Sequence, residues 1–186
     1  MIWNSAYYWG VPAKILHWVA AVLVALLFVH GHVWLDDWDE RGTAGRGALV
    51  WHAAAGMTLA AVMLGRMLWR LVNRTPMMPA ATPYWEKRAA HVAHAALYGL
   101  TFAVAATGWL AAGAVTPQVV SRVLWLVAVP PPGFDGGKLV RELHELLADM
   151  LVALAAAHAL AALWHHFVRK DSVLRRMLLR GRVRSR

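Results

Sequence analysis

Two histidines in the last long apolar run of the chain have the spacing of ligands inside a membrane. His144 and His158 stand fourteen residues apart within residues 139–168. Fourteen residues make nearly four helical turns, so both imidazoles point to one side of a helix, about 21 Å apart along its axis. A single helix would therefore offer one imidazole near each face of a bilayer.

An imidazole in hydrocarbon is costly unless it finds a partner, which makes an intramembrane histidine a functional residue by default. The chain has ten histidines and no cysteine. Without cysteine there can be no disulfide, thiolate zinc site, cysteine-ligated iron–sulfur cluster or haem attached through thioethers. A redox centre would have to be held by other ligands, and histidines are available for it.

The elements that would position these residues are four apolar stretches. The chain has 186 residues, of which 60% are hydrophobic, too many for a soluble domain of this size. About 20 apolar residues span a bilayer. The stretches that reach this length are residues 13–35, 47–71, 89–115 and 139–168. We therefore predict an all-α membrane protein, a bundle of four transmembrane helices forming a single domain over residues 1–186.

The first span could instead be a cleaved signal peptide, but its apolar run is long and no convincing cleavage site follows it. Between the third and fourth spans, residues 116–138 form the longest connection. Within it, residues 119–129 are apolar but too short to cross, and prolines bracket them. We expect this stretch to lie on the membrane surface or to fold back over the bundle.

The distribution of charge predicts the orientation of the bundle. Fourteen of the nineteen lysines and arginines lie on one side of the predicted bundle, in the N-terminal segment, the connection between the second and third spans and the C-terminal tail, counting Lys14, Arg66 and Arg70 at the span ends. Because basic residues concentrate on the cytoplasmic side of membrane proteins, both termini are predicted to be cytoplasmic. The basic tail would lie along the inner headgroups. This placement explains the net charge of +9 and argues against nucleic acid as a partner.

A comparison of depth across the spans pairs the histidines. His17 and His158 lie at similar depths near the cytoplasmic edge, and His52 and His144 lie at similar depths near the outer edge. Two neutral imidazoles above and below an iron porphyrin make a six-coordinate centre that changes little on electron transfer. We therefore predict two haems, one held by His17 and His158 and the other by His52 and His144.

Small residues beside the predicted ligands are consistent with a flat macrocycle between the helices. They occur in the runs His52-Ala53-Ala54-Ala55-Gly56 and Ala155-Ala156-Ala157-His158-Ala159. Such residues also promote helix packing by themselves, so no single alanine decides between the two interpretations.

Spacing leaves other assignments open. His91 and His94 share a face near the inner end of the third span and could compete with His17 as ligands, or bond to a haem propionate or a lipid headgroup. The remaining histidines fall at span ends and are interpreted as interfacial residues; they are His30, His32, His165 and His166.

Several motifs resemble the prokaryotic cytochrome b561 family over nearly the whole chain and in the family's order. They are Lys14-Ile15-Leu16-His17-Trp18, Trp51-His52-Ala53-Ala54-Ala55-Gly56, Arg66-Met67-Leu68-Trp69-Arg70-Leu71, Leu143-His144-Glu145, the paired His165-His166 and Lys170-Asp171-Ser172-Val173-Leu174-Arg175-Arg176-Met177. The resemblance implies a four-helix cytochrome with two b-type haems in the bacterial inner membrane, exchanging electrons with ubiquinone. It also implies that the ligands are His17, His52, His144 and His158, with His91 and His94 as non-ligands.

Some members of this family are thought to oxidise superoxide at the outer face and to reduce ubiquinone, so the leading expectation is a membrane superoxide:ubiquinone oxidoreductase. Three basic residues near the outer haem could attract a small anion, namely Arg122, Lys138 and Arg141. The alternative interpretation, as ordinary loop and helix-end charges, is the favoured one for these residues. The second expectation is quinol-linked electron transfer to a periplasmic redox protein.

Two other classes of membrane protein would use the same histidines. A membrane anchor of a larger dehydrogenase would also bind haem, but would copurify with a catalytic subunit. A histidine-lined metal transporter would show no haem absorbance and would be expected to carry intramembrane carboxylates, for which Asp149 is the best candidate.

Overall fold

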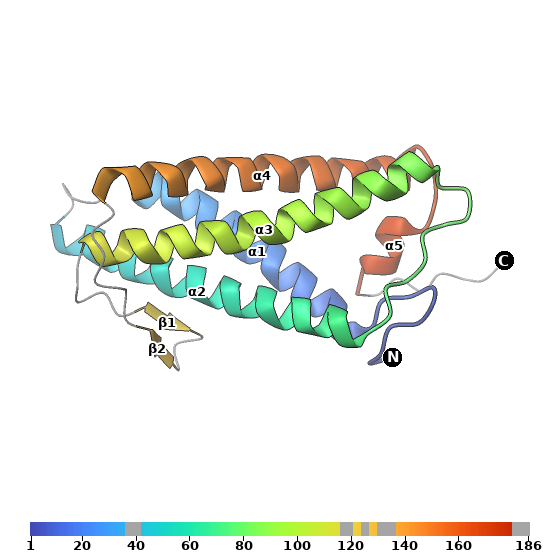
Figure 1. Cartoon of the computed structure of the whole chain (residues 1–186), viewed down its shortest axis with the longest axis horizontal. Helices are drawn as coiled ribbons and strands as arrows, with labels where there is room; N and C mark the ends of the chain where they lie inside the picture. Colours follow the sequence, from blue (N-terminus) through green and yellow to red (C-terminus); the bar gives the residue numbers. More distant parts are fainter. Residues whose placement is uncertain (36–41, 116–120, 124–126, 130–136, 180–186) are drawn as a thin grey trace.

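The computed structural model describes residues 1–35, 42–115, 121–123, 127–129 and 137–179. Four long helices dominate it (Figure 1): α1 Val11–Trp34, α2 Gly42–Val72, α3 Tyr84–Val115 and α4 Gly137–Phe167. Two short strands, β1 Ser121–Val123 and β2 Val127–Val129, and a short helix, α5 Val173–Met177, complete it. All four long helices are apolar and long enough to cross a membrane. The predicted all-α bundle of four spans is thus confirmed.

The middle helices begin before the predicted apolar stretches. α2 starts at Gly42 and α3 at Tyr84, five residues earlier than expected in each case. The prediction counted apolar residues, whereas a helix continues for as long as its backbone bonds are made. For α3 the start is set by Pro83, whose carbonyl accepts a hydrogen bond from the Lys87 amide (3.2 Å). The charged first turns of α3 are therefore helical rather than part of the loop.

The connection between α3 and α4 contains a small β element. β1 and β2 pair antiparallel, with Arg122 opposite Ala128, and β1 contacts α2. The expectation for residues 119–129 named no strand, because two three-residue strands give no readable periodicity. The remaining residues of that stretch lie outside the described part of the chain, and the predicted location at the membrane surface stays a prediction.

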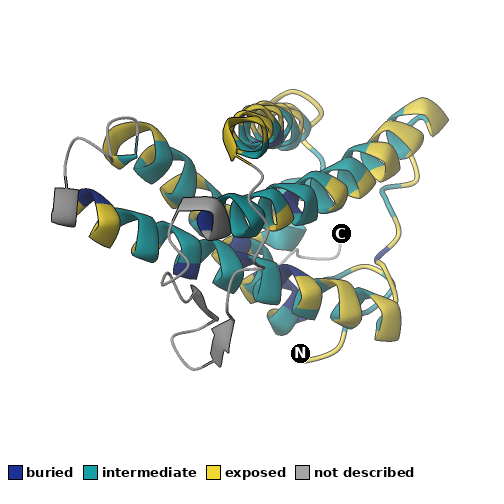
Figure 2. Cartoon of the chain, turned by 60° about the vertical axis from the view of Figure 1, so that its left-hand side comes forward, coloured by how far each residue is buried: buried dark blue, intermediate teal, exposed yellow. Residues whose placement is uncertain are grey.

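Neighbouring helices pack in chain order, α1 on α2, α2 on α3, and α3 on α4, whereas α1 and α4 meet at few positions. The buried cluster of Ala20, Leu59 and Met63 lies between α1 and α2, with Tyr98 and Phe102 of α3 packed against it. Of α4, only Leu151 is fully buried. Large apolar side chains on the outward faces of the helices are exposed (Figure 2), as expected for surfaces that contact lipid.

One end of the bundle gathers both terminal segments and the α2–α3 connection (Figure 1). The Asn4 side-chain amide donates to the Arg74 carbonyl (2.9 Å), and the Met77 amide donates to the Ala6 carbonyl (2.8 Å). Trp3 stacks on Trp69 with ring centres 5.4 Å apart. The strands lie at the opposite end. The three segments that carry most of the basic residues therefore share one end, as the charge distribution predicted.

Candidate functional site

The structure brings together the two members of each predicted histidine pair. His17 of α1 and His158 of α4 have ring centres 6.3 Å apart and rings inclined by 75°. His52 of α2 and His144 of α4 have ring centres 6.1 Å apart and rings inclined by 83°. Each pair spans the space between α4 and one of the first two helices, and α4 contributes one histidine to each.

These separations agree with the geometry of two imidazoles on one metal. A first-row metal holds an imidazole nitrogen at about 2 Å, and the ring centre lies roughly 1 Å further out. Two imidazoles on opposite sides of one metal therefore have ring centres about 6 Å apart. Both pairs fit this arrangement, and direct packing of the rings would allow a closer approach.

A further histidine lies beside each pair. His94 of α3 is 5.1 Å from His158, and His30 of α1 is 5.6 Å from His52, between ring centres. Both separations are shorter than the distance of about 6 Å expected between two imidazoles on opposite sides of one metal. His91, in contrast, is exposed and donates from Nδ1 to the Lys87 carbonyl of its own helix (2.6 Å). The two histidines that the sequence grouped on one face thus have different surroundings, and only His94 reaches a pair.

Sequence reasoning missed the position of His30 beside His52. It interpreted His30 as an interfacial residue because this histidine falls near the end of its span. The signal was available in the antiparallel packing of α1 on α2, which places the last turns of one helix beside the first half of the other.

A cavity of about 510 Å³ surrounds the His52–His144 pair. It falls within the range of about 300–1,000 Å³ that is usual for ligand and cofactor sites. Glycines from all four long helices line it, namely Gly31, Gly56, Gly108 and Gly137. A Cβ on Gly108 would lie 2.8 Å from Cε1 of His144, and one on Gly31 would lie 3.6 Å from Cε1 of His52. Gly108 therefore lets the His144 ring lie against α3, at a place where a larger side chain would collide with it.

The backbone of α3 orients His144. Nδ1 of His144 lies 3.0 Å from the Val104 carbonyl and 3.3 Å from the Thr107 hydroxyl oxygen. The Thr107 hydroxyl itself donates to the Ala103 carbonyl (2.8 Å). Since a carbonyl only accepts, Nδ1 of His144 carries the proton, and Nε2 is left as the nitrogen with a free lone pair. Bonds of this kind fix the tautomer and the ring direction of a metal-binding histidine.

Several imidazole nitrogens are buried without a hydrogen-bond partner among the described residues. They are the Nδ1 atoms of His17, His30 and His52, together with that of His166. A buried polar atom without a partner costs about 1–3 kcal/mol, so its retention calls for an explanation. Three of these four belong to the pairs or to a histidine beside one of them. The directions of these imidazole rings are therefore set by packing rather than by hydrogen bonds from Nδ1 to the described residues.

Cations border the His17–His158 pair. Arg66 lies within electrostatic reach of both imidazoles, and its guanidinium sits over the Tyr98 ring, 5.4 Å from the centre. Arg66 and Arg70 also line a small cavity with Trp9 and Trp69. This end of the bundle therefore offers a positive charge to an acidic group bound near the imidazoles.

The three predicted anion-attracting residues differ in what the structure shows of them. Lys138 pairs with Glu142 (3.3 Å) and Arg141 pairs with Glu145 (2.9 Å), both within the first turns of α4. Both basic residues line the cavity around the His52–His144 pair. Arg122 belongs to β1, and its side chain lies outside the described part of the structure. Neighbouring carboxylates thus offset the two described charges.

Among the described residues, no group of three or more His, Asp or Glu side chains is arranged to hold a bare metal ion. Asp149, the carboxylate that a metal-transport path would use, instead faces Nε2 of His32 at 3.8 Å, and both side chains are more than half exposed. This arrangement gives no support to a histidine-lined transport path. The predicted imidazole ligands come in pairs, and two imidazoles suit a metal whose other ligands come from a macrocycle.

Comparison with known proteins points to a single family. The family model for prokaryotic cytochrome b561 matches residues 8–180. The chain is 32% identical to "Cytochrome b561 homolog 2" of Escherichia coli K12, covering 94% of this chain and 93% of that protein. It is 29% identical to "Cytochrome b561 homolog 1" of the same organism, over 89% and 93% of the two chains. It is also 30% identical to "Probable superoxide oxidase CybB" of Yersinia pestis, over 90% and 93%. The chain is thus a multi-pass membrane protein of redox type, and it belongs to the prokaryotic cytochrome b561 family.

Proposed function

We propose that this protein is a dihaem cytochrome that carries electrons between the two faces of a bacterial inner membrane, with both termini in the cytoplasm. Membership of the family implies b-type haem. The number of haems is proposed from the presence of two imidazole pairs, His17–His158 and His52–His144. Both have ring-centre separations that two imidazole ligands of one metal would have.

The four paired histidines would hold the two irons. When bound, a b-type haem would supply an iron that exchanges single electrons. The protein's own part is to fix the imidazoles, to clear space with glycine and alanine, and to balance charge. We assign Arg66 to a haem carboxylate at the His17–His158 pair, because it is the cation within reach of both imidazoles. His91, which is exposed and turned to its own helix, is assigned no ligand role.

We further propose superoxide as the electron donor and ubiquinone as the acceptor. Each superoxide would give up one electron and leave as dioxygen, and two such electrons with two protons would convert ubiquinone to ubiquinol. The name of the Yersinia pestis relative supports superoxide as the donor. Lys138 and Arg141 beside the cavity support the attraction of an anion to that end, with Arg122 as a third candidate.

Quinol-linked electron transfer to a periplasmic redox protein is the second candidate. One observation favours it: Glu142 and Glu145 pair with the two described cations of the cavity mouth and so weaken their field. A superoxide pulse separates the candidates. Rapid reduction of the haems, followed by reoxidation on addition of ubiquinone, supports the first. No reduction in intact dihaem protein, with prompt reduction by ubiquinol, supports the second.

The number and ligands of the haems are tested by absorbance and by haem-to-protein ratio in detergent-purified protein. We expect a ratio of two for the native chain. His144→Ala and His158→Ala should each lower the ratio to one, since each would remove a proposed iron ligand from a different haem. His91→Ala is the matched control and should leave it at two. A colourless protein from haem-replete cells, or retention of both haems by both ligand variants, would contradict the assignment.

A further inference from the structure

The chain beyond α4 turns back onto the end of the bundle that holds the His17–His158 pair. α4 ends at Phe167, and Lys170 takes a left-handed conformation (φ 55°) that reverses the chain. The following residues, 169–178, are referred to below as the C-terminal segment. Beyond α4 itself, their side chains and carbonyls make contacts with α1, with the start of α3 and with the α2–α3 connection.

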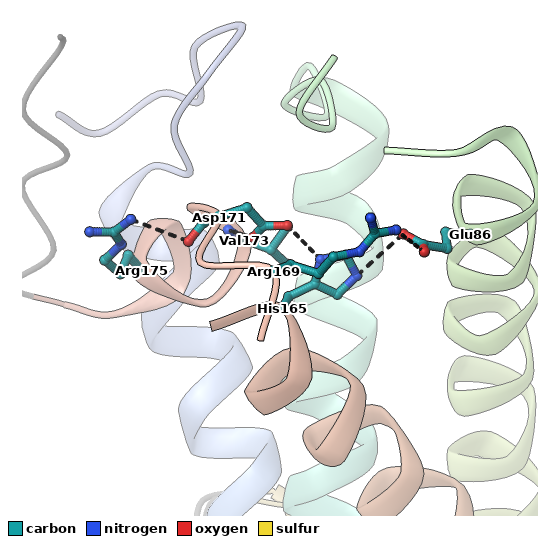
Figure 3. A network of polar contacts seen from close by, with 6 residues as sticks. All are labelled: Glu86, His165, Arg169, Asp171, Val173 and Arg175. Carbon is teal, nitrogen blue, oxygen red and sulfur yellow. Dashed lines mark hydrogen bonds and ion pairs between the residues drawn. The ribbon is translucent and has the colours of Figure 1, made fainter. Parts of the chain in front are cut away.

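Hydrogen bonds and an ion pair among partly buried side chains fix the beginning of the C-terminal segment (Figure 3). Nδ1 of His165 donates to an Asp171 carboxylate oxygen (2.6 Å), and the other oxygen of Asp171 accepts the Val173 amide (2.9 Å) at the start of α5. Arg169 pairs with Glu86 of α3. The side chains of Glu86 and His165 are only 13% and 15% exposed. Such bonds are less screened by water than surface ion pairs, so they hold α5 in a defined place.

A further contact ties the C-terminal segment to the α2–α3 connection. Arg176 donates from its guanidinium to the Met77 carbonyl (2.7 Å). The C-terminal segment is therefore anchored to a second part of the chain that is distant in sequence, which restricts its position against α1.

The far end of the C-terminal segment bonds to α1 on both sides of His17. Nζ of Lys14 donates to the Leu178 carbonyl (2.9 Å), and the indole N–H of Trp18 donates to the Met177 carbonyl (3.0 Å). Lys14 is 8% exposed, and a buried ammonium is tolerated only with a hydrogen-bond acceptor. Lys14 and Trp18 are four residues apart and so share one face of α1.

Trp18 connects these bonds to the predicted ligand. Its ring meets the His17 ring edge-on, with centres 5.3 Å apart and planes inclined by 67°. Nδ1 of His17 has no hydrogen-bond partner among the described residues, in contrast to that of His144, which the Val104 carbonyl orients. The direction of the His17 ring therefore depends on its packing neighbours rather than on a bond of its own.

We propose that the C-terminal segment is a positioning element for the haem at the His17–His158 pair, acting through Lys14 and Trp18 on His17. The proposal rests on the haem assignment made above. The carbonyls of Met177 and Leu178 hold the first turns of α1, and Trp18 transmits that position to the imidazole. The contacts of the C-terminal segment described above all lie at this end, so the His52–His144 pair serves as an internal reference.

The experiment uses full-length, dihaem protein and two variants that leave every predicted ligand in place. Trp18→Phe keeps an aromatic ring but removes the donor to Met177. Asp171→Ala acts at a distance, because it releases the start of α5 without touching α1. Trp164→Phe is the matched control, since Trp164 is an exposed tryptophan at the same end of the bundle. The signals of the two haems are assigned with His17→Ala and His52→Ala.

We expect both variants to shift the redox midpoint and the low-spin EPR signal of the haem that His17→Ala removes. The shift should change the electron distribution between the two haems by about two- to tenfold, the size of one lost hydrogen bond. The other haem and the Trp164→Phe protein should be unchanged.

Two results would overturn the proposal while leaving the dihaem assignment intact. One is that both variants keep two haems with unshifted signals. The other is an equal shift of both haems, which would mean a general loosening of the bundle. Native protein without haem would instead refute the proposed function, and this inference with it. If Trp18→Phe does not yield folded protein, Asp171→Ala decides alone.

Discussion

Substitution of Gly108 by alanine tests whether the cavity around the His52–His144 pair holds a haem. A Cβ at this position would lie 2.8 Å from Cε1 and 3.1 Å from Nδ1 of His144. Ordinary contact begins at 3.4 Å, so the imidazole would have to retreat by about 0.6 Å. A ligand constellation tolerates displacements of about 0.5 Å. The retreat would also stretch the bond from His144 to the Val104 carbonyl.

We therefore expect Gly108→Ala to weaken haem binding at this pair by about 10- to 100-fold, the usual effect of disturbing the partners of a metal ligand. Binding at the His17–His158 pair should be unchanged. The assay is the haem-to-protein ratio of purified protein, followed by titration of the variant with added haem. A ratio near one that rises towards two at high haem concentration is the expected outcome.

Gly99 provides a matched control on the same helix, because a Cβ there would meet nothing within 4 Å. Both substitutions raise the helix propensity of α3 by at most about 1 kcal/mol, so a difference between them reports the contact with His144. If Gly108→Ala keeps both haems with native affinity and unshifted spectra, the assignment of this cavity to a haem held by His144 is refuted.

Three further predictions follow from the same structure. His94→Ala should shift the absorbance spectrum of the haem at the His17–His158 pair without loss of that haem, and should leave the other haem unchanged. Loss of the haem would instead mean that His94 is a ligand in place of His17. Arg141→Gln should slow haem reduction by superoxide about two- to tenfold at low salt, and the difference should vanish at high salt. Pulse radiolysis measures the rate, with Lys87→Gln as the control. Equal rates would mean that Arg141 only pairs with Glu145 and does not attract superoxide. Asn4→Ala should lower the midpoint of thermal unfolding by several degrees. The reason is that the Asn4 side chain donates a hydrogen bond to the Arg74 carbonyl and accepts one from the Gly10 amide. An unchanged midpoint would mean that these bonds of the N-terminal segment add no stability.

The fold was largely predictable because a bilayer imposes simple rules. Each long helix corresponds to one apolar stretch, since a spanning segment must satisfy its own backbone and expose apolar side chains to lipid. Helix starts were less predictable, as Gly42 and Tyr84 show. For α3 the deciding factor is Pro83 rather than hydrophobicity. The short strands β1 and β2 depend on pairing between residues that carry no alternating pattern.

The candidate site, too, could be predicted from the sequence only in part. Depth along the spans predicted which histidines meet, because an α-helix has a fixed rise and the spans share one thickness. Depth says nothing about rotation around a helix axis, so it could not separate His94, which reaches His158, from His91, which does not. Nor could it find Gly108 or the Val104 carbonyl beside His144, since α3 carries no predicted ligand and its role depends on packing.

One histidine of each pair stands on α4, fourteen residues from the other. The interval between the two histidine pairs along the bundle is therefore set by the backbone hydrogen bonds of one continuous helix. Loops at either end can change length, sequence or docking partner without altering that interval. In the proposed dihaem arrangement, a new donor or acceptor at the surface would leave the length of the electron path through the interior unchanged.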